Sequence, residues 1–157
     1  MPRRMYPLSA KTTVPSIYFD TAPFIYLLEG HPEFSGRVAQ IIRQGVVDGV
    51  QFSTSTLAVM EFSVKPLQNG RHDVLAAFDG LLRELDFIVQ PVTVEIAREA
   101  ARLRSVYPYL KGLDALHLST AKSLGSEVFL TNDHQLARVK EIPVKTLADY
   151  PATSHSD

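Results

Sequence analysis

Residues 128–136, VFLTNDHQL, place three apolar residues directly before a hydroxyl, an amide, a carboxylate and an imidazole. The apolar part has the length and composition of a short strand in a protein core. In open parallel α/β sheets, reactive side chains collect just beyond the carboxyl ends of the strands. The stretch therefore predicts a core strand that delivers Thr131 and Asp133 to the edge of a sheet.

Other strand-like segments occur along the chain, with helical segments between them. The extended segments cover residues 16–20 (SIYFD), 50–53 (VQFS), 86–92 (DFIVQPV), 127–131 (EVFLT) and 142–147 (IPVKTL). Helical periodicity or helix-start signals cover residues 21–30, 34–47, 53–64, 74–85, 93–106, 113–124 and 134–139. Strands separated by long helices require crossover connections. The sequence therefore predicts a three-layer α/β/α domain with a mostly parallel central sheet.

The composition predicts one compact domain. The chain has 157 residues, of which 45% are hydrophobic and 21% charged, and these values are average for a soluble globular protein. It has no cysteine, which favours a reducing compartment, and we expect the cytoplasm. No apolar stretch of membrane-span or signal-peptide length follows the basic N-terminus. We expect a poorly ordered leader over residues 1–15, a single domain over 16–150 and a tail over 151–157.

Four acids stand at strand ends or beside apolar residues. Asp20 ends the first strand, and Asp133 lies two residues beyond Thr131 at the end of the fourth. Glu61 lies in the helix after the second strand, and Asp114 lies in the first turn of a mostly apolar helix. Taken singly, Asp20 and Asp133 also fit turn or cap residues, and Asp114 fits a first-turn acid that interacts with the helix dipole.

Together the four acids predict a bound cation. Carboxylates brought within about 4 Å would repel by about 4 kcal/mol per pair at an effective dielectric near 20. Oxygen ligands without cysteine favour Mg²⁺ or Mn²⁺ over zinc. Such an ion could activate a water molecule and orient a phosphate.

At this point the sequence resembles the PIN-domain ribonucleases and, in size and motif layout, the single-domain VapC-like toxins of prokaryotic toxin–antitoxin pairs. The matching segments are IYFDTAPFIYLLEG, STSTLAVMEF, KGLDALHLSTAKSLG and VFLTNDHQL. This resemblance implies a doubly wound parallel sheet, a carboxylate pocket with one or two Mg²⁺ or Mn²⁺ ions, and hydrolysis of RNA phosphodiester bonds. It also implies an inhibitory antitoxin partner and a homodimer.

Carried over by position, the resemblance makes Asp20, Glu61, Asp114 and Asp133 the metal-binding and catalytic acids. Thr131 becomes the hydroxyl that hydrogen-bonds among them. Whether Glu61 binds the metal or orients the attacking water stays open. The sequence names neither the RNA target nor the number of metal ions.

The net charge of −1 looks unsuited to a polyanionic substrate. Setting aside the four proposed site acids, however, leaves 13 acidic against 16 basic residues, a remainder of +3. Arg98 and Arg102 fit a solvated helix face, although with Lys111 they could also meet phosphates.

Two other functions remain open at this stage. One is a phosphoacceptor signalling domain, which would normally place a pair of acids after its first strand, where this chain has Asp20 alone. The other is a catalytically inactive PIN-like domain that binds RNA or protein. Asp114 and His117 have the spacing of a di-iron ligand pair, but no second such pair exists. We therefore interpret His117 as a partly buried packing residue.

Overall fold

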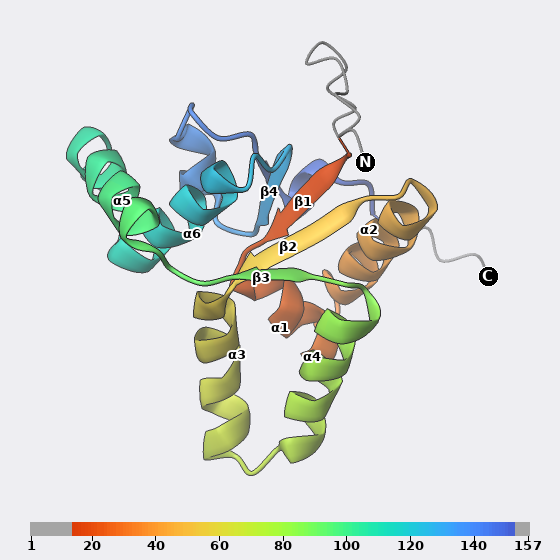
Figure 1. The fold of residues 1–157 in the computed structure, drawn as a ribbon. Helices are drawn as coiled ribbons and strands as arrows, with labels where there is room; N and C mark the ends of the chain where they lie inside the picture. Colours follow the sequence, from red (N-terminus) through yellow and green to blue (C-terminus); the bar gives the residue numbers. More distant parts are fainter. Residues whose placement is uncertain (1–13, 153–157) are drawn as a thin grey trace, which may run out of the picture.

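The computed structural model describes residues 14–152, so most of the expected leader and tail lies outside the described residues. Five strands form one sheet in the order β3-β2-β1-β4-β5, and every pairing is parallel (Figure 1). Their bounds are β1 (Ser16–Phe19), β2 (Gln51–Ser55), β3 (Ile88–Gln90), β4 (Val128–Thr131) and β5 (Val144–Thr146). The predicted mostly parallel sheet is confirmed.

Helices connect the strands and cover both faces of the sheet, as Figure 1 shows. The helices are α1 (Thr21–Glu29), α2 (Ser35–Val47), α3 (Thr56–Gln68), α4 (His72–Glu84), α5 (Val94–Val106) and α6 (Gly112–Ser123), with 3-10 turns η1 (His134–Arg138) and η2 (Leu147–Asp149). The predicted α/β/α layering is therefore confirmed.

The two faces of the sheet support two separate cores. Because successive side chains of a strand point to opposite faces, Tyr18 and Phe19 of β1 enter different cores. Phe19 packs with Phe24 and Phe52 in the core beneath α1 to α4. Tyr18 packs with Phe129 in the core beneath α5 and α6. This alternation brings the Tyr18 side chain to the face on which α6 lies.

Some element boundaries differ from the prediction. The helix expected to start at Ser53 or Thr54 begins at Thr56, because β2 continues to Ser55. Thr54 Oγ1 donates to the Phe19 carbonyl over 2.8 Å and ties the end of β2 to β1. Ser55 then caps α3 by accepting a hydrogen bond from the Leu57 amide. The strand expected over 86–92 contracts to β3.

Helix α3 buries one of its sides against the core. Its buried residues are Ala58, Phe62 and Pro66. The apolar residues on its outer side remain exposed, namely Met60, Val64 and Leu67 at 52%, 49% and 59%.

Within the described residues, no helix combines the length and apolar character needed to cross a bilayer.

Candidate active site

The site begins where β1 and β4 lie side by side, with Phe19 in register with Leu130. The chain leaves β1 toward β2 on one side and leaves β4 toward β5 on the other, so the sheet order reverses at this pair. In open α/β sheets a crevice for ligands forms at such a switch point, outside the carboxyl ends of the strands. Asp20 follows β1 directly, and Thr131 is the last residue of β4.

Asp20 has a partner on each carboxylate oxygen. Oδ2 accepts a hydrogen bond from Thr131 Oγ1 at 2.8 Å. Oδ1 accepts one from the Thr21 amide at 2.9 Å, so Asp20 is the N-cap of α1. The cap interaction fixes the Asp20 carboxylate at the mouth of the crevice.

Asp133 is held close to Asp20 through Thr131. The Asp133 amide donates to Thr131 Oγ1 over 3.1 Å, and Asp133 Oδ1 accepts from the Gln135 amide at 3.0 Å as the N-cap of η1. A single buried hydroxyl therefore links the two acids. Asp20 and Asp133 are thus both helix caps, as the sequence also allowed, and capping does not remove either side chain from the crevice.

Glu61 reaches the site from α3 and is held through one oxygen. Oε1 accepts hydrogen bonds from His117 Nε2 at 2.6 Å and from Thr21 Oγ1 at 3.0 Å. On its other nitrogen, Nδ1, His117 meets the Tyr18 hydroxyl at 2.7 Å. The imidazole is only 1% exposed.

The interpretation of His117 as a partly buried packing residue was therefore wrong. The ring is fully buried, and it contacts an acid of the site. Sequence reasoning also missed Tyr18 and Thr21. The one available signal was that Tyr18 and Thr21 flank Asp20 closely in the first motif.

All four acids line one open pocket of about 650 Å³, Asp114 entering from the first turn of α6. The remaining lining residues are Thr21, Ala22, Ile25, Tyr26, Thr131, Asn132, His134 and Gln135. The four acids come from segments as far apart as residues 20 and 133, so folding alone assembles the pocket.

The pKa values of two acids are shifted. Burial, followed by the charges of Asp20 and Asp133, raises the pKa of Asp114. Burial also acts to raise the pKa of Glu61, but the hydrogen bond from His117, the positive charge of that ring when it is protonated and the Thr21 hydrogen bond outweigh burial, so this pKa is lowered. Asp114 therefore experiences the mutual repulsion of the cluster, while Glu61 is stabilised as a carboxylate.

The donor chemistry of this pocket fits Mg²⁺ or Mn²⁺. Its acids supply only oxygen, and the repulsion at Asp114 is the kind that a divalent cation relieves. Across residues 14–152, no three His, Asp or Glu side chains stand close enough together to coordinate one ion directly. Mg²⁺ commonly keeps several of its waters and binds through one or two carboxylates, which does not require three converging side chains.

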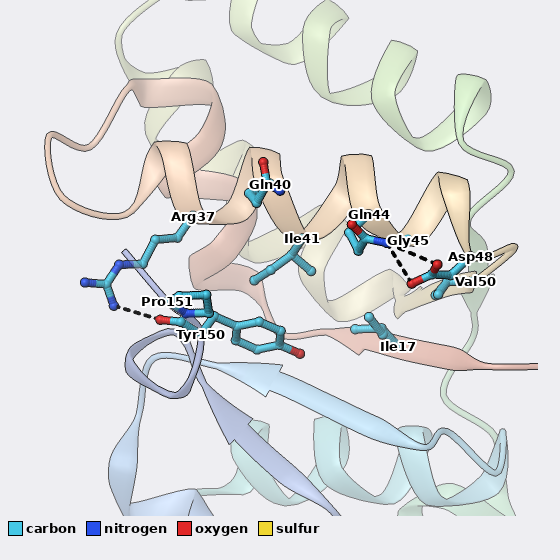
Figure 2. A pocket seen from close by; sticks show the side chains of 10 residues that line it. All are labelled: Ile17, Arg37, Gln40, Ile41, Gln44, Gly45, Asp48, Val50, Tyr150 and Pro151. Atoms are coloured by element: carbon cyan, nitrogen blue, oxygen red, sulfur yellow. Dashed lines mark hydrogen bonds between the residues drawn. The ribbon is translucent and has the colours of Figure 1, made fainter. Parts of the chain in front are cut away.

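A second hollow, of about 330 Å³, lies beside α2 near the amino ends of β1 and β2 (Figure 2). Arg37 closes one side by donating to the carbonyls of Leu147 and Tyr150 over 3.2 and 3.4 Å. Asp48 is the one acid among its lining residues. This hollow therefore lacks the carboxylate cluster of the first pocket.

Arg102 takes part in ion pairs on the surface. It pairs with Glu99 and Glu141, each at 2.6 Å, and Lys122 joins Glu99 at 2.8 Å. This ion-pair network fixes α5 against α6 on the surface and agrees with the expectation of a solvated helix face.

The fold and the pocket define a parallel α/β domain with an acidic site at the switch point of its sheet. A model of the PIN domain matches residues 17–142. The chain therefore belongs to the PIN domain family.

Solved structures agree with this fold. VapBC2 from Rickettsia felis, bound to promoter DNA, has 12% identity and a TM-score of 0.72, covering 87% of this chain and 99% of its own. A toxin–antitoxin complex from Klebsiella pneumoniae has 23% identity and a TM-score of 0.66, covering 83% and 97%. VapC20 from Mycobacterium tuberculosis, described as a toxin that cleaves the sarcin–ricin loop, has 16% identity and a TM-score of 0.63, covering 79% and 95%. The comparison with curated protein sequences gave no match.

Proposed function

We propose that this chain is a divalent-metal-dependent endoribonuclease that hydrolyses RNA phosphodiester bonds and is the toxin of a toxin–antitoxin pair. The observation that carries the proposal is the set of four carboxylates, from four separate elements, in one pocket at the switch point of a PIN domain. Similarity to a toxin that cleaves an RNA loop supports RNA as the substrate class.

In this proposal Asp20, Glu61, Asp114 and Asp133 hold Mg²⁺ or Mn²⁺. When bound, the ion supplies a water of lowered pKa and a positive charge for the scissile phosphate. The chain's own contribution is to hold the acids in place: Thr131 fixes Asp20, and both Thr21 and His117 fix Glu61. Lys111 lies at the N-cap of α6, where its charge acts on Asp114, and we expect it to meet the RNA backbone.

We also propose a protein partner. One of the similar structures is described as a toxin–antitoxin complex and another as a member of a family of toxin–antitoxin systems, which supports an antitoxin for this chain. The exposed side chains of Met60, Val64 and Leu67 on α3, next to Glu61, support self-association as a homodimer. Light scattering on the purified chain tests the dimer, and a Leu67→Glu variant is expected to shift it toward the monomer. A cytoplasmic location follows from the same proposal.

Cleavage of mixed RNA by the purified protein, with Mn²⁺ and with a chelator, tests the function. We expect fragments only in the presence of the metal. Asp20→Asn, which removes a site charge while keeping the shape of the side chain, is expected to abolish cleavage. Asp79→Asn is the matched control, because Asp79 is exposed on α4 and lies outside the pocket.

Two results would contradict the proposal. Full metal-dependent cleavage by Asp20→Asn would remove the assignment of the site. RNA binding without cleavage by the unaltered protein would favour the alternative, an inactive PIN-like binding domain.

A further inference from the structure

We propose that Tyr18 and His117 form a buried positioning pair that holds Glu61 by its oxygen Oε1 and leaves Oε2 for the metal ion or its water. This inference rests on the proposed function and deepens it, since it states how Glu61 is presented to the pocket. It assigns a role to two residues that do not themselves line the pocket.

The pair is a continuous chain of hydrogen bonds across three elements. The Tyr18 hydroxyl of β1 lies 2.7 Å from His117 Nδ1, and His117 Nε2 of α6 lies 2.6 Å from Glu61 Oε1 of α3. Tyr18 is 0% exposed and His117 is 1% exposed, so water does not compete for these contacts. Hydrogen bonds in such a setting are strong, and an unpaired partner there is costly.

The direction of each hydrogen bond follows from the chemistry of the phenol. A phenol ionises only at about pH 10, so at neutral pH the Tyr18 hydroxyl keeps its proton and can donate it to Nδ1, which lies 2.7 Å away. A neutral imidazole that accepts on Nδ1 carries its proton on Nε2. Nε2 is therefore the donor to Glu61, and the Tyr18 hydroxyl and the Glu61 carboxylate favour the same tautomer.

The two donors to Glu61 meet the same oxygen. Thr21 Oγ1 reaches Oε1 at 3.0 Å, and His117 Nε2 reaches it at 2.6 Å. Oε2 makes no hydrogen bond with any residue of the described chain, although the Glu61 side chain is 29% exposed and lines the pocket. One oxygen is thus occupied by the protein, and the other has no hydrogen-bond partner among the described residues.

The contacts of Tyr18 also allow a clean test. Its ring stacks on Phe129 at a centroid distance of 5.2 Å, so Tyr18→Phe removes the hydroxyl and keeps the packing. Tyr109→Phe is a matched control, because the Tyr109 hydroxyl is buried, has no hydrogen-bond partner among the described residues and does not contact Glu61.

The first experiment reads the tautomer directly in metal-free protein. Nitrogen-15 NMR over a series of pH values distinguishes a proton on Nε2, a proton on Nδ1 and a ring protonated on both nitrogens. We expect His117 to carry its proton on Nε2, and we expect Tyr18→Phe to populate the other tautomer. A proton on Nδ1 in the unaltered protein would overturn the inference.

The second experiment measures Mn²⁺ affinity by calorimetry in a double-mutant cycle. Loss of a residue that orients a metal ligand typically weakens metal binding by about 10- to 100-fold. We expect losses of this size for His117→Leu and Tyr18→Phe, none for Tyr109→Phe, and tighter binding by His117→Gln, which retains a donor, than by His117→Leu. In a Glu61→Ala background, His117→Leu is expected to have no further effect, because His117 acts through Glu61.

The two possible failures are distinguishable. An equal loss in both backgrounds, or equal losses for His117→Gln and His117→Leu, would show that His117 only supports the fold and would overturn the inference. If Mn²⁺ binding follows the expected cycle but the unaltered protein does not cut RNA, the positioning role stands and the proposed function fails.

Discussion

Thr131→Val removes the hydroxyl that joins two of the site acids. The side chain is 0% exposed, and valine keeps nearly the same shape. Its hydroxyl donates to Asp20 Oδ2 over 2.8 Å and accepts from the Asp133 amide at 3.1 Å. The substitution therefore deletes one hydrogen bond to a charged group and leaves one backbone N–H without its acceptor.

The expected cost follows from these two contacts. A hydrogen bond to a charged group contributes about 1.5 to 3 kcal/mol, and an N–H left without a partner costs about 1 kcal/mol or more. We therefore expect the free energy of unfolding to fall by about 3 kcal/mol, which in a chain of this size lowers Tm by roughly 6 to 12 °C. Urea and thermal unfolding of the metal-free protein measure both values. RNA cleavage should fall as well, because Asp20 loses its support.

Two further variants serve as controls. Thr131→Ser keeps the hydroxyl and loses one methyl group, for a cost of about 1 kcal/mol. Thr54→Val deletes an equally buried hydroxyl whose acceptor is the neutral Phe19 carbonyl, again for about 1 kcal/mol. If Thr131→Val costs no more than Thr54→Val, the hydroxyl does not hold the acids and the reasoning is refuted.

Three other predictions concern the pocket and the core. Burial and the neighbouring acids raise the pKa of Asp114, so its charge destabilises the metal-free fold above that pKa and has no effect in strong acid. Asp114→Asn should therefore raise the urea midpoint of unfolding at about pH 8 and leave it unchanged near pH 3. A lower midpoint at pH 8 would contradict this prediction. Mn²⁺ at about 100 times its Kd should raise the free energy of unfolding by about 2.7 kcal/mol, which raises Tm by roughly 5 to 11 °C. A chelator should remove this gain, and an unchanged Tm would argue against a metal site. Gly45→Ala places a Cβ 2.5 Å from Phe52 Cζ and should lower the free energy of unfolding by about 1 to 3 kcal/mol. Gly80→Ala, whose nearest neighbour lies 3.9 Å away, should raise it by about 0.5 to 1 kcal/mol. Calorimetry should therefore show shifts in Tm of opposite sign for the two variants.

The strand ends of the site were predictable from the sequence because the chain changes there from apolar to polar. VFLTND marks the end of β4, and IYFD marks the end of β1. A parallel sheet brings such ends to one edge, so the common location of Asp20 and Asp133 followed from topology. The end of β2 was less visible, because four consecutive residues, Ser53 to Thr56, are all plausible caps. A tertiary contact, from Thr54 to Phe19, decides between them.

The position of His117 was not predictable for a related reason. Helix α6 buries Ala115, Leu118, Ser119 and Thr120 alongside His117, so its sequence does not show one apolar stripe that would orient the ring. The partner Tyr18 lies 99 residues away in the sequence, and the face of the sheet that its side chain enters is known only from the folded structure with both cores.

The order of strands in the sheet has a consequence for folding during synthesis on the ribosome. β4 is made late, yet it lies between β1 and β5 and supplies the Thr131 side of the pocket. A nascent chain that has emerged only as far as α6 has Asp20, Glu61 and Asp114 but an uncovered edge on β1, and no Thr131 hydroxyl for the Asp20 carboxylate. Translation itself therefore delays completion of the acidic crevice until the chain has been synthesised past Asp133.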